Sequence, residues 1–280
     1  FATLREDGTV GVRPGNVGPP VDPALTTKVV ELNDLDALEA ALAPGDVACV
    51  LAEPALTNIG IVLPEPGFHE ALRELTRRTG ALLVIDETHT FSAGPGGYTA
   101  AHGLEPDLLT IGKAIGGGVP VGALGLTEEI ARRAFEQEDA DYEDVGGIGG
   151  TLAGNALSLA AVRATLGEVL TSEAFSEMIA LGERLEDRLI RVITDAGLPW
   201  HVTRVGARAE YRFAPQPARN GGESALAGDE ELERFLHLHA LNRGVLITPF
   251  HNMALVCPAT SEADVDRHAD VLSGALGELA

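Results

Sequence analysis

Residues 81–86 read Ala-Leu-Leu-Val-Ile-Asp, an uninterrupted apolar run that ends in an acid. Two other runs have the same form: residues 47–51 stop just before Glu53-Pro54, and residues 108–111 end beside Lys113. Segments with apolar residues at helical spacing lie between them. Uniformly apolar strands that alternate with helices are typical of parallel strands covered on both faces, whereas alternating polar residues would indicate an antiparallel sandwich. We therefore predict an α/β fold with a mostly parallel sheet.

The charge of the chain excludes several classes of partner. Its 42 acidic and 20 basic residues give a formal net charge of -22. Nucleic acids and anionic membranes need clustered Lys and Arg, so we expect neither as a partner. No apolar run reaches the roughly 18 residues of a membrane span, and no signal-peptide pattern is present. We expect a soluble, cytoplasmic protein, in which only Lys28 and Lys113 are lysines against 18 arginines.

The second half of the chain predicts a smaller α+β domain. A long helical pattern follows Asn155, a further helix is expected after a cap at Asp229, and Ser261 with Asp264 forms a capping box before the last one. Short strands are expected within 197–213 and at 245–248, with a polar loop at 214–228. We divide the chain into a large domain, residues 1–167, and a small domain, residues 168–280.

Three polar groups follow the predicted parallel strands: Glu53, Asp86 and Lys113. Ligands of open parallel sheets bind beyond the carboxyl ends of the strands, so these groups are expected to converge on a site. Either acid could equally be a helix cap or part of a solvated loop. Lys113 stands between Ile-Gly and Ala-Ile, an apolar setting in which a desolvated amine becomes available as a nucleophile.

Two glycine-rich segments could bring backbone N–H groups close to a ligand. Gly116-Gly117-Gly118 is one, and Gly149-Gly150-Thr151 is the other, where a hydroxyl at a helix start could also hold a phosphate. Taken alone, either segment also fits a flexible linker. We expect no metal site, because His237 and His239 are two residues apart on a predicted helix and point to different sides.

The motifs together resemble the class III aminotransferases, which are pyridoxal phosphate enzymes of fold type I, and within them the glutamate-1-semialdehyde aminomutases. The resemblance extends from about residue 33 to the end and weakens after 170. It rests on residues 83–88 (LVIDET), 106–118 (PDLLTIGKAIGGG), 121–123 (VGA) and 150–157 (GTLAGNAL).

The resemblance implies roles for three cofactor-binding residues. Lys113 is similar to the lysine that forms the Schiff base with pyridoxal 5'-phosphate and moves the proton between substrate and cofactor. Asp86 is similar to the carboxylate that pairs with the pyridine nitrogen. Thr88 stands at the position that packs on the ring face, where a valine is common.

The resemblance also implies a homodimer with shared active sites. Thr151, which follows Gly150, is similar to the residue that reaches the cofactor phosphate of the neighbouring subunit. Glu53 and Asn58 belong to a loop that borders the substrate. Two features depart from the family: residues 89–93 replace the usual turn after the ring-packing residue, and the phosphate-binding loop and stacking aromatic of an N-terminal part are not found. We therefore expect the large domain to be incomplete at its N-terminus.

Three more residues are candidates for the substrate. Arg208 and Arg212 alternate with apolar residues on a predicted strand and could bind a carboxylate bidentately, although salt bridges to the many acids are the simpler expectation. His251 follows a predicted strand end and could equally lie in a structural turn.

The expected function is transfer of an amino group between an amine or amino acid and a carbonyl acceptor. An intramolecular aminomutase is the alternative, and a non-catalytic protein or fragment is a further one.

Overall fold

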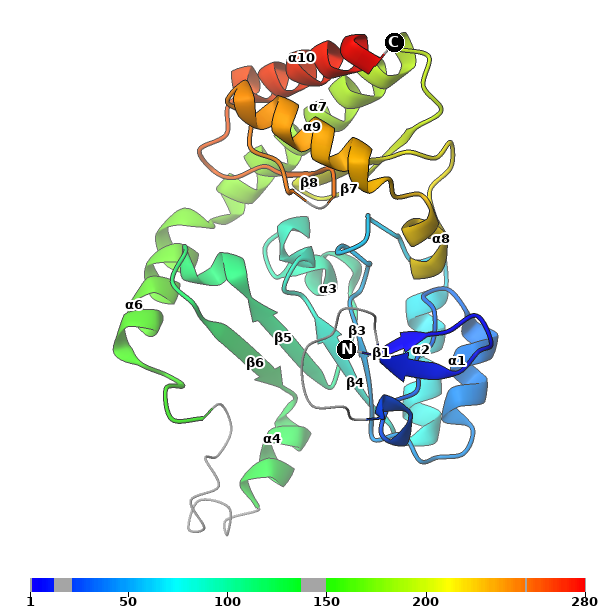
Figure 1. Ribbon diagram of the computed structural model, residues 1–280. Helices are drawn as coiled ribbons and strands as arrows, with labels where there is room; N and C mark the ends of the chain where they lie inside the picture. The colour runs from blue at the N-terminus through cyan, green and yellow to red at the C-terminus, as the bar shows by residue number, and fades with distance from the viewer. Residues whose placement is uncertain (1, 13–21, 137–149, 250, 280) are drawn as a thin grey trace.

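The computed structural model describes residues 2–12, 22–136, 150–249 and 251–279. Within them, a four-stranded sheet with its helices lies below a three-stranded sheet that carries three long helices (Figure 1). No helix in these ranges is long and apolar enough to cross a membrane.

The larger sheet is the predicted one with an added strand. It contains β3 (Cys49–Ala52), β4 (Leu82–Asp86), β5 (Leu108–Gly112) and β6 (Gly122–Leu126), in that order. The first three strands are parallel and β6 is antiparallel to β5. The expected α/β fold with a mostly parallel sheet is confirmed. The sequence did not indicate β6, because its glycines resemble a turn.

Two helices cover one face of this sheet. They are α1 (Leu35–Leu42), which Asp34 caps through the N–H of Ala37, and α2 (Phe68–Thr79). Their buried leucines pack against the apolar side chains of β4. The other elements of the first half are β1 (Ala2–Leu4), β2 (Val10–Val12), η1 (Pro23–Leu25), η2 (Thr90–Ala93), α3 (Gly97–His102), η3 (Lys113–Gly116) and α4 (Glu128–Phe135).

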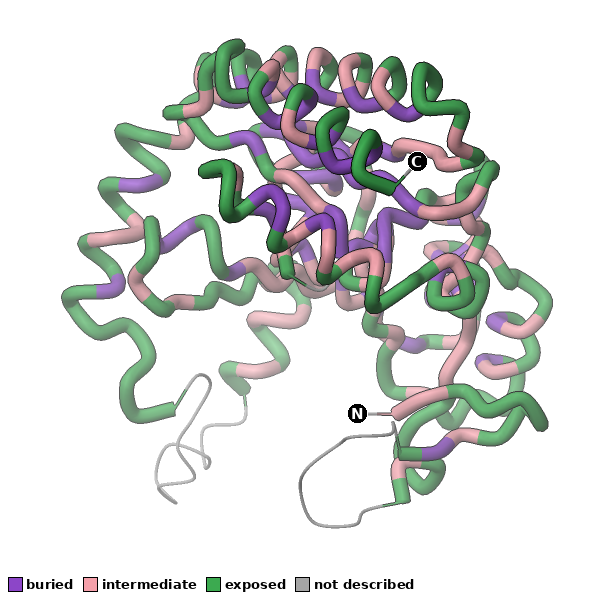
Figure 2. Tube along the Cα trace, turned by 45° about the horizontal axis from the view of Figure 1, so that its top comes forward, coloured by how far each residue is buried: buried purple, intermediate pink, exposed green. Residues whose placement is uncertain are grey.

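The smaller sheet is antiparallel and ordered β7-β8-β9. Its strands are β7 (His201–Val205), β8 (Arg208–Arg212) and β9 (Met253–Leu255). The helices of this part are α6 (Ala156–Ala164), the π-helix η4 (Thr165–Val169), α7 (Ser172–Asp195), α8 (Gly221–Leu226), α9 (Glu230–Asn242) and α10 (Glu262–Leu279). Helices α7, α9 and α10 bury their apolar faces in one core with β8, and the buried residues in Figure 2 concentrate there.

Two expectations for this part are wrong. Residues 245–248 form no strand, because the N–H of Val245 closes the end of α9 by donating to the carbonyl of Ala240 (2.9 Å), so it is unavailable to a sheet. The expected loop 214–228 contains α8, whose first turn Asn220 caps. The expected caps of α9 and α10 at Asp229 and Ser261 are confirmed.

The turn between β7 and β8 joins the two halves of the molecule. It consists of Gly206 and Ala207, and its tip lies against η2. The N–H of Ala207 donates to the carbonyl of Ser92 (3.0 Å), and the carbonyl of Ala207 accepts from the N–H of Val256 (2.9 Å). The first residue of β8, Arg208, is thereby placed beside the carboxyl ends of the larger sheet.

Candidate active site

A cavity of about 460 Å³ lies between the carboxyl edge of the larger sheet and the smaller sheet. Its polar lining residues include Asn58, Thr88, His89, Lys113 and Arg208. Much of the remaining wall is apolar and comes from η2, α7 and the segment around β9: Phe91, Phe175, Met178, Leu255 and Val256. Most of the residues singled out from the sequence therefore lie on or beside one cavity.

Lys113 follows β5 directly and starts η3. Its φ of 47° is left-handed, a conformation that among the described residues other than glycine only Asn33 shares. Left-handed backbone disfavours residues with a Cβ by about 1–2 kcal/mol, and such strain is found most often at functional sites. The expected burial of the amine is wrong, because Lys113 is exposed.

Asp86 ends the neighbouring strand β4. It pairs in register with Thr110 of β5, three residues before Lys113, so the two groups leave the sheet at the same edge. Its Oδ1 accepts from the N–H of Thr88 (2.9 Å), which fixes the carboxylate and places Thr88 in the cavity wall. The structure thus brings a primary amine and a carboxylate to adjacent strand ends.

His89 contributes to the site although the sequence marked it only as a departure from the family. Its Nε2 contacts Nζ of Lys113, and its Nδ1 lies 2.9 Å from the hydroxyl of Thr57. Burial, with the positive charges of Arg208 and Lys113, lowers the pKa of His89 to about 4. Glu53 accepts from Thr57, and burial raises the pKa of its carboxyl group. The one sequence signal for His89 was its position as a polar residue shortly after the strand that ends in Asp86-Glu87.

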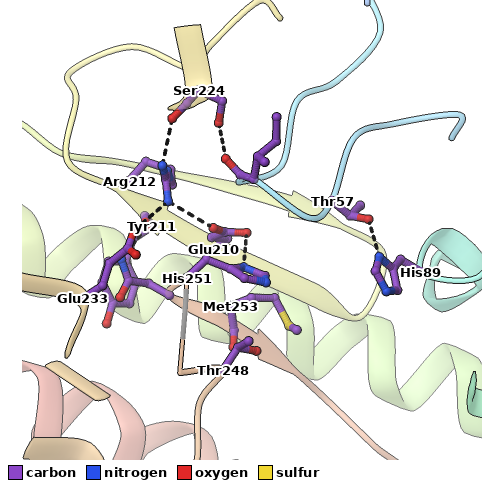
Figure 3. A network of polar contacts seen from close by, with 12 residues as sticks. Thr57, His89, Glu210, Tyr211, Arg212, Ser224, Glu233, Thr248, His251 and Met253 are labelled. Atoms are coloured by element: carbon purple, nitrogen blue, oxygen red, sulfur yellow. Dashed lines mark hydrogen bonds and ion pairs between the residues drawn. The ribbon is translucent and has the colours of Figure 1, made fainter. Parts of the chain in front are cut away.

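The two candidate arginines have different surroundings. Arg208 is 5% exposed, lines the cavity, and its Nε has no hydrogen-bond partner. Burial lowers the pKa of Arg208, and this effect exceeds the opposite effect of the negative charges of Glu210 and Glu53, which raise it. Arg212 lies outside the cavity wall and is held by Glu233 (3.0 Å) and the carbonyl of Ser224 (2.8 Å), as Figure 3 shows. Arg212 is therefore paired within the protein, as the expectation of a salt bridge to one of the acids had it.

His251 lines the cavity, and its Nδ1 lies 3.2 Å from Oε2 of the fully buried Glu210 (Figure 3). Gly150 and Thr151 are exposed and are not among the residues that line the cavity. Gly149 lies outside the described residues. No cluster of three or more metal-ligating side chains occurs in the described part of the chain.

The family model for class III aminotransferases matches residues 22–276. The chain belongs to this family. The family uses pyridoxal 5'-phosphate, the cofactor that the sequence led us to expect.

Relatives of this class III aminotransferase chain include glutamate-1-semialdehyde 2,1-aminomutases. That of Opitutus terrae is 38% identical, and the match covers 95% of this chain and 62% of the relative. That of Anaeromyxobacter sp. is 34% identical, with 97% and 62% covered. The chain therefore spans a little over three fifths of the length of these relatives.

Solved structures share the fold. A glutamate-1-semialdehyde-aminomutase from Pseudomonas aeruginosa is 50% identical with a TM-score of 0.93, covering 100% of this chain and 62% of the other. A variant of that protein is described in complex with PMP. An omega-transaminase from Sphaerobacter thermophilus is 27% identical with a TM-score of 0.83, covering 99% and 63%. The fold type I architecture expected from the sequence is confirmed.

The residues at the cavity fit the cofactor by their chemistry. Lys113 offers an amine for an aldehyde, and Asp86 offers an anion for a pyridine nitrogen from the next strand. Both groups are fixed by backbone at the same sheet edge, and the cavity beside them also contains a buried arginine.

Proposed function

We propose that this chain catalyses transfer of an amino group between a carboxylate-bearing amino compound and a carbonyl acceptor, with Lys113 as the reactive amine. The observation that carries the proposal is the placement of Lys113 and Asp86 at the ends of adjacent strands beside one cavity. The membership of the family supports it.

Each residue has a defined task in this reaction. When bound, pyridoxal phosphate supplies an electron sink for the carbanion formed at the substrate carbon. Asp86 holds a negative charge where the pyridine nitrogen must stay protonated, and its hydrogen bond from Thr88 keeps it in place. Lys113 Nζ would take the proton from the substrate carbon and deliver it to the bound cofactor, because it is the amine that lines the cavity.

Arg208 is the proposed partner of the substrate carboxylate. A guanidinium binds a carboxylate through two parallel hydrogen bonds, and the free Nε of Arg208 lies in the cavity wall without a partner. The apolar wall formed with Phe175, Met178 and Val256 favours a substrate whose remaining side chain is apolar. This combination supports an amino acid, with a carboxylate at one end and an apolar group at the other.

An intramolecular aminomutase is the second candidate, favoured by the names of the relatives that are 34–50% identical. A mutase moves the amino group within one molecule and needs no second substrate. Adding a 2-oxo acid should therefore accelerate turnover of an amino acid by a transaminase and leave a mutase unaffected. A homodimer that shares its active sites remains part of the proposal, supported by the exposure of Thr151.

The chain offers a sharp test because it contains only two lysines. The full chain is incubated with pyridoxal phosphate, reduced with borohydride and digested. The pyridoxyl group should be found on Lys113 and be absent from Lys28, an exposed residue whose amine is paired with Asp46. Lys113→Ala should abolish labelling and turnover, and Lys28→Ala should change neither. Equal labelling of both lysines, or turnover by Lys113→Ala, would refute the proposal.

A further inference from the structure

Four side chains form a hydrogen-bonded chain that runs from Lys113 into the protein. Lys113 Nζ contacts His89 Nε2, and the other ring nitrogen of His89 lies 2.9 Å from the hydroxyl of Thr57. That hydroxyl donates to Oε2 of Glu53 at 2.5 Å. Figure 3 shows the contact between Thr57 and His89. The chain connects residues that follow three successive strands, β3, β4 and β5.

The number of protons on each group determines the direction of the hydrogen bonds in this series of side chains. The hydroxyl of Thr57 has one proton, which it donates to the carboxylate of Glu53, so its oxygen is left to accept from His89. The neutral ring of His89 carries one proton, and this proton must be on Nδ1 to satisfy Thr57. A lone pair on Nε2 then faces the amine of Lys113. Thr57 is fully buried, so water cannot replace these bonds without rearrangement.

The surroundings keep His89 neutral. The charged or titratable groups that act on it are Lys113, Arg208 and His251, which disfavour its protonation, and Asp86, which favours it. Glu53 Oε2 is 3.9 Å from Nδ1. Burial is the largest influence, and it also favours the uncharged ring.

The tautomer matters to the amine. If Nε2 carried the proton, its N–H would donate to the lone pair of the neutral Lys113 amine and occupy the electrons that a nucleophile or base needs. With the proton on Nδ1, the amine donates to His89 and its own lone pair stays free to face the cavity. The hydrogen bond also fixes the direction of a flexible side chain that is otherwise exposed.

We propose that Glu53 and Thr57 are positioning residues that hold His89 as its Nδ1-protonated tautomer, so that His89 orients the free amine of Lys113 with its lone pair toward the cavity. The inference rests on the proposed function only in taking Lys113 as the reactive amine. It assigns to the departure at residue 89 a role that depends on two residues from the loop after β3.

The test compares two substitutions of Thr57 in the full chain without added cofactor. Thr57→Val keeps the shape and removes both hydrogen bonds, whereas Thr57→Ser keeps the hydroxyl. Nitrogen chemical shifts of ¹⁵N-labelled histidine, with His89 assigned by its loss in His89→Gln, report which ring nitrogen carries the proton. We expect the Nδ1–H tautomer in the unsubstituted chain and in Thr57→Ser, and its loss in Thr57→Val.

A second readout follows the amine itself. The rate at which Lys113 is labelled by pyridoxal phosphate and borohydride should fall about three- to tenfold in Thr57→Val, the range that one hydrogen bond supplies, and should be retained in Thr57→Ser. An Nε2–H tautomer in the unsubstituted chain, or an unchanged tautomer in Thr57→Val, would overturn the inference. If Lys113 is not labelled in any variant but the tautomer shifts as expected, the proposed function fails while the positioning of His89 stands.

Discussion

Gly206→Ala adds a single methyl group at the turn between β7 and β8. We expect this methyl group to push the turn away from η2, and so to separate the two parts of the molecule that line the candidate site. A Cβ built there would lie 2.3 Å from the carbonyl oxygen of Ser92 and 2.4 Å from Cα of Ala93, both of them backbone atoms of η2. Ordinary contact begins at 3.4 Å, so the turn must retreat by about 1 Å. The φ of Gly206 is also left-handed, at 57°.

The cost of Gly206→Ala has two parts. Left-handed backbone alone disfavours alanine by about 1–2 kcal/mol. Retreat of the turn also breaks the bond from the N–H of Ala207 to Ser92, and a buried backbone group left unpaired adds about 1–3 kcal/mol. We therefore expect the free energy of unfolding to fall by roughly 2–5 kcal/mol.

Gly197 provides a matched control. Its φ of 67° is equally left-handed, but nothing lies within 4 Å of a Cβ built there. Gly197→Ala should therefore show the backbone cost alone, about 1–2 kcal/mol. Urea unfolding of both variants measures the difference, and hydrogen exchange at Ala207 should accelerate only in Gly206→Ala. Equal destabilisation by the two substitutions would show that the contact with η2 is not a stabilising one.

Two further predictions concern charge. Asp107 accepts two hydrogen bonds from Arg73 (2.8 and 2.9 Å) and one from the N–H of Leu83. Asp107→Asn should therefore lower the free energy of unfolding by about 1–3 kcal/mol. The control is Glu105→Gln, which removes the exposed ion pair with Arg77 and should cost less than about 1 kcal/mol. The hydrogen bond from Arg73 lowers the pKa of Asp107 in the folded chain. The stabilisation is therefore present above the unfolded-state pKa, near 3.9, and is lost as the pH falls through the lower folded-state pKa. Unfolding of Asp107→Asn should lack this pH dependence. Burial lowers the pKa of His268 to about 4, so the unfolded chain binds the proton first and stability falls by up to about 3 kcal/mol as pH drops from about 6.5 toward 4. The thermal unfolding temperature over this pH range should depend less on pH in His268→Leu than in the unsubstituted chain. Substitution of the exposed His102 should leave the pH dependence unchanged. An unchanged pH dependence in His268→Leu would contradict the assignment.

The larger sheet was predictable because its parallel strands are continuous apolar runs. Continuous apolar runs such as residues 82–85 contain no polar residue, and they alternate with amphipathic helices. β6 could not be found in this way, since its residues are mostly exposed and two of them are glycines. Local signals such as the caps at Asp229 and Ser261 were also reliable, because each depends on a side chain and an N–H three residues away.

The site was predictable only where the backbone of the larger sheet determines it. Asp86 and Lys113 lie at adjacent strand ends because parallel strands end at one edge of the sheet. The distinction between Arg208 and Arg212 depends on contacts over long sequence distances. Arg212 pairs through Nη1 with Glu233 from α9, 21 residues along the chain, whereas Arg208 forms no ion pair with the described residues. Both arginines have the same local pattern, so the sequence left both open.

The position of Arg208 relative to Lys113 is set by backbone hydrogen bonds. The residue before Arg208 donates to Ser92 of the loop that carries His89, and it accepts from Val256 of the segment after β9. Because neither bond involves a side chain of the cavity, replacing Arg208 changes the charge of the cavity wall without removing what aligns the two sheets.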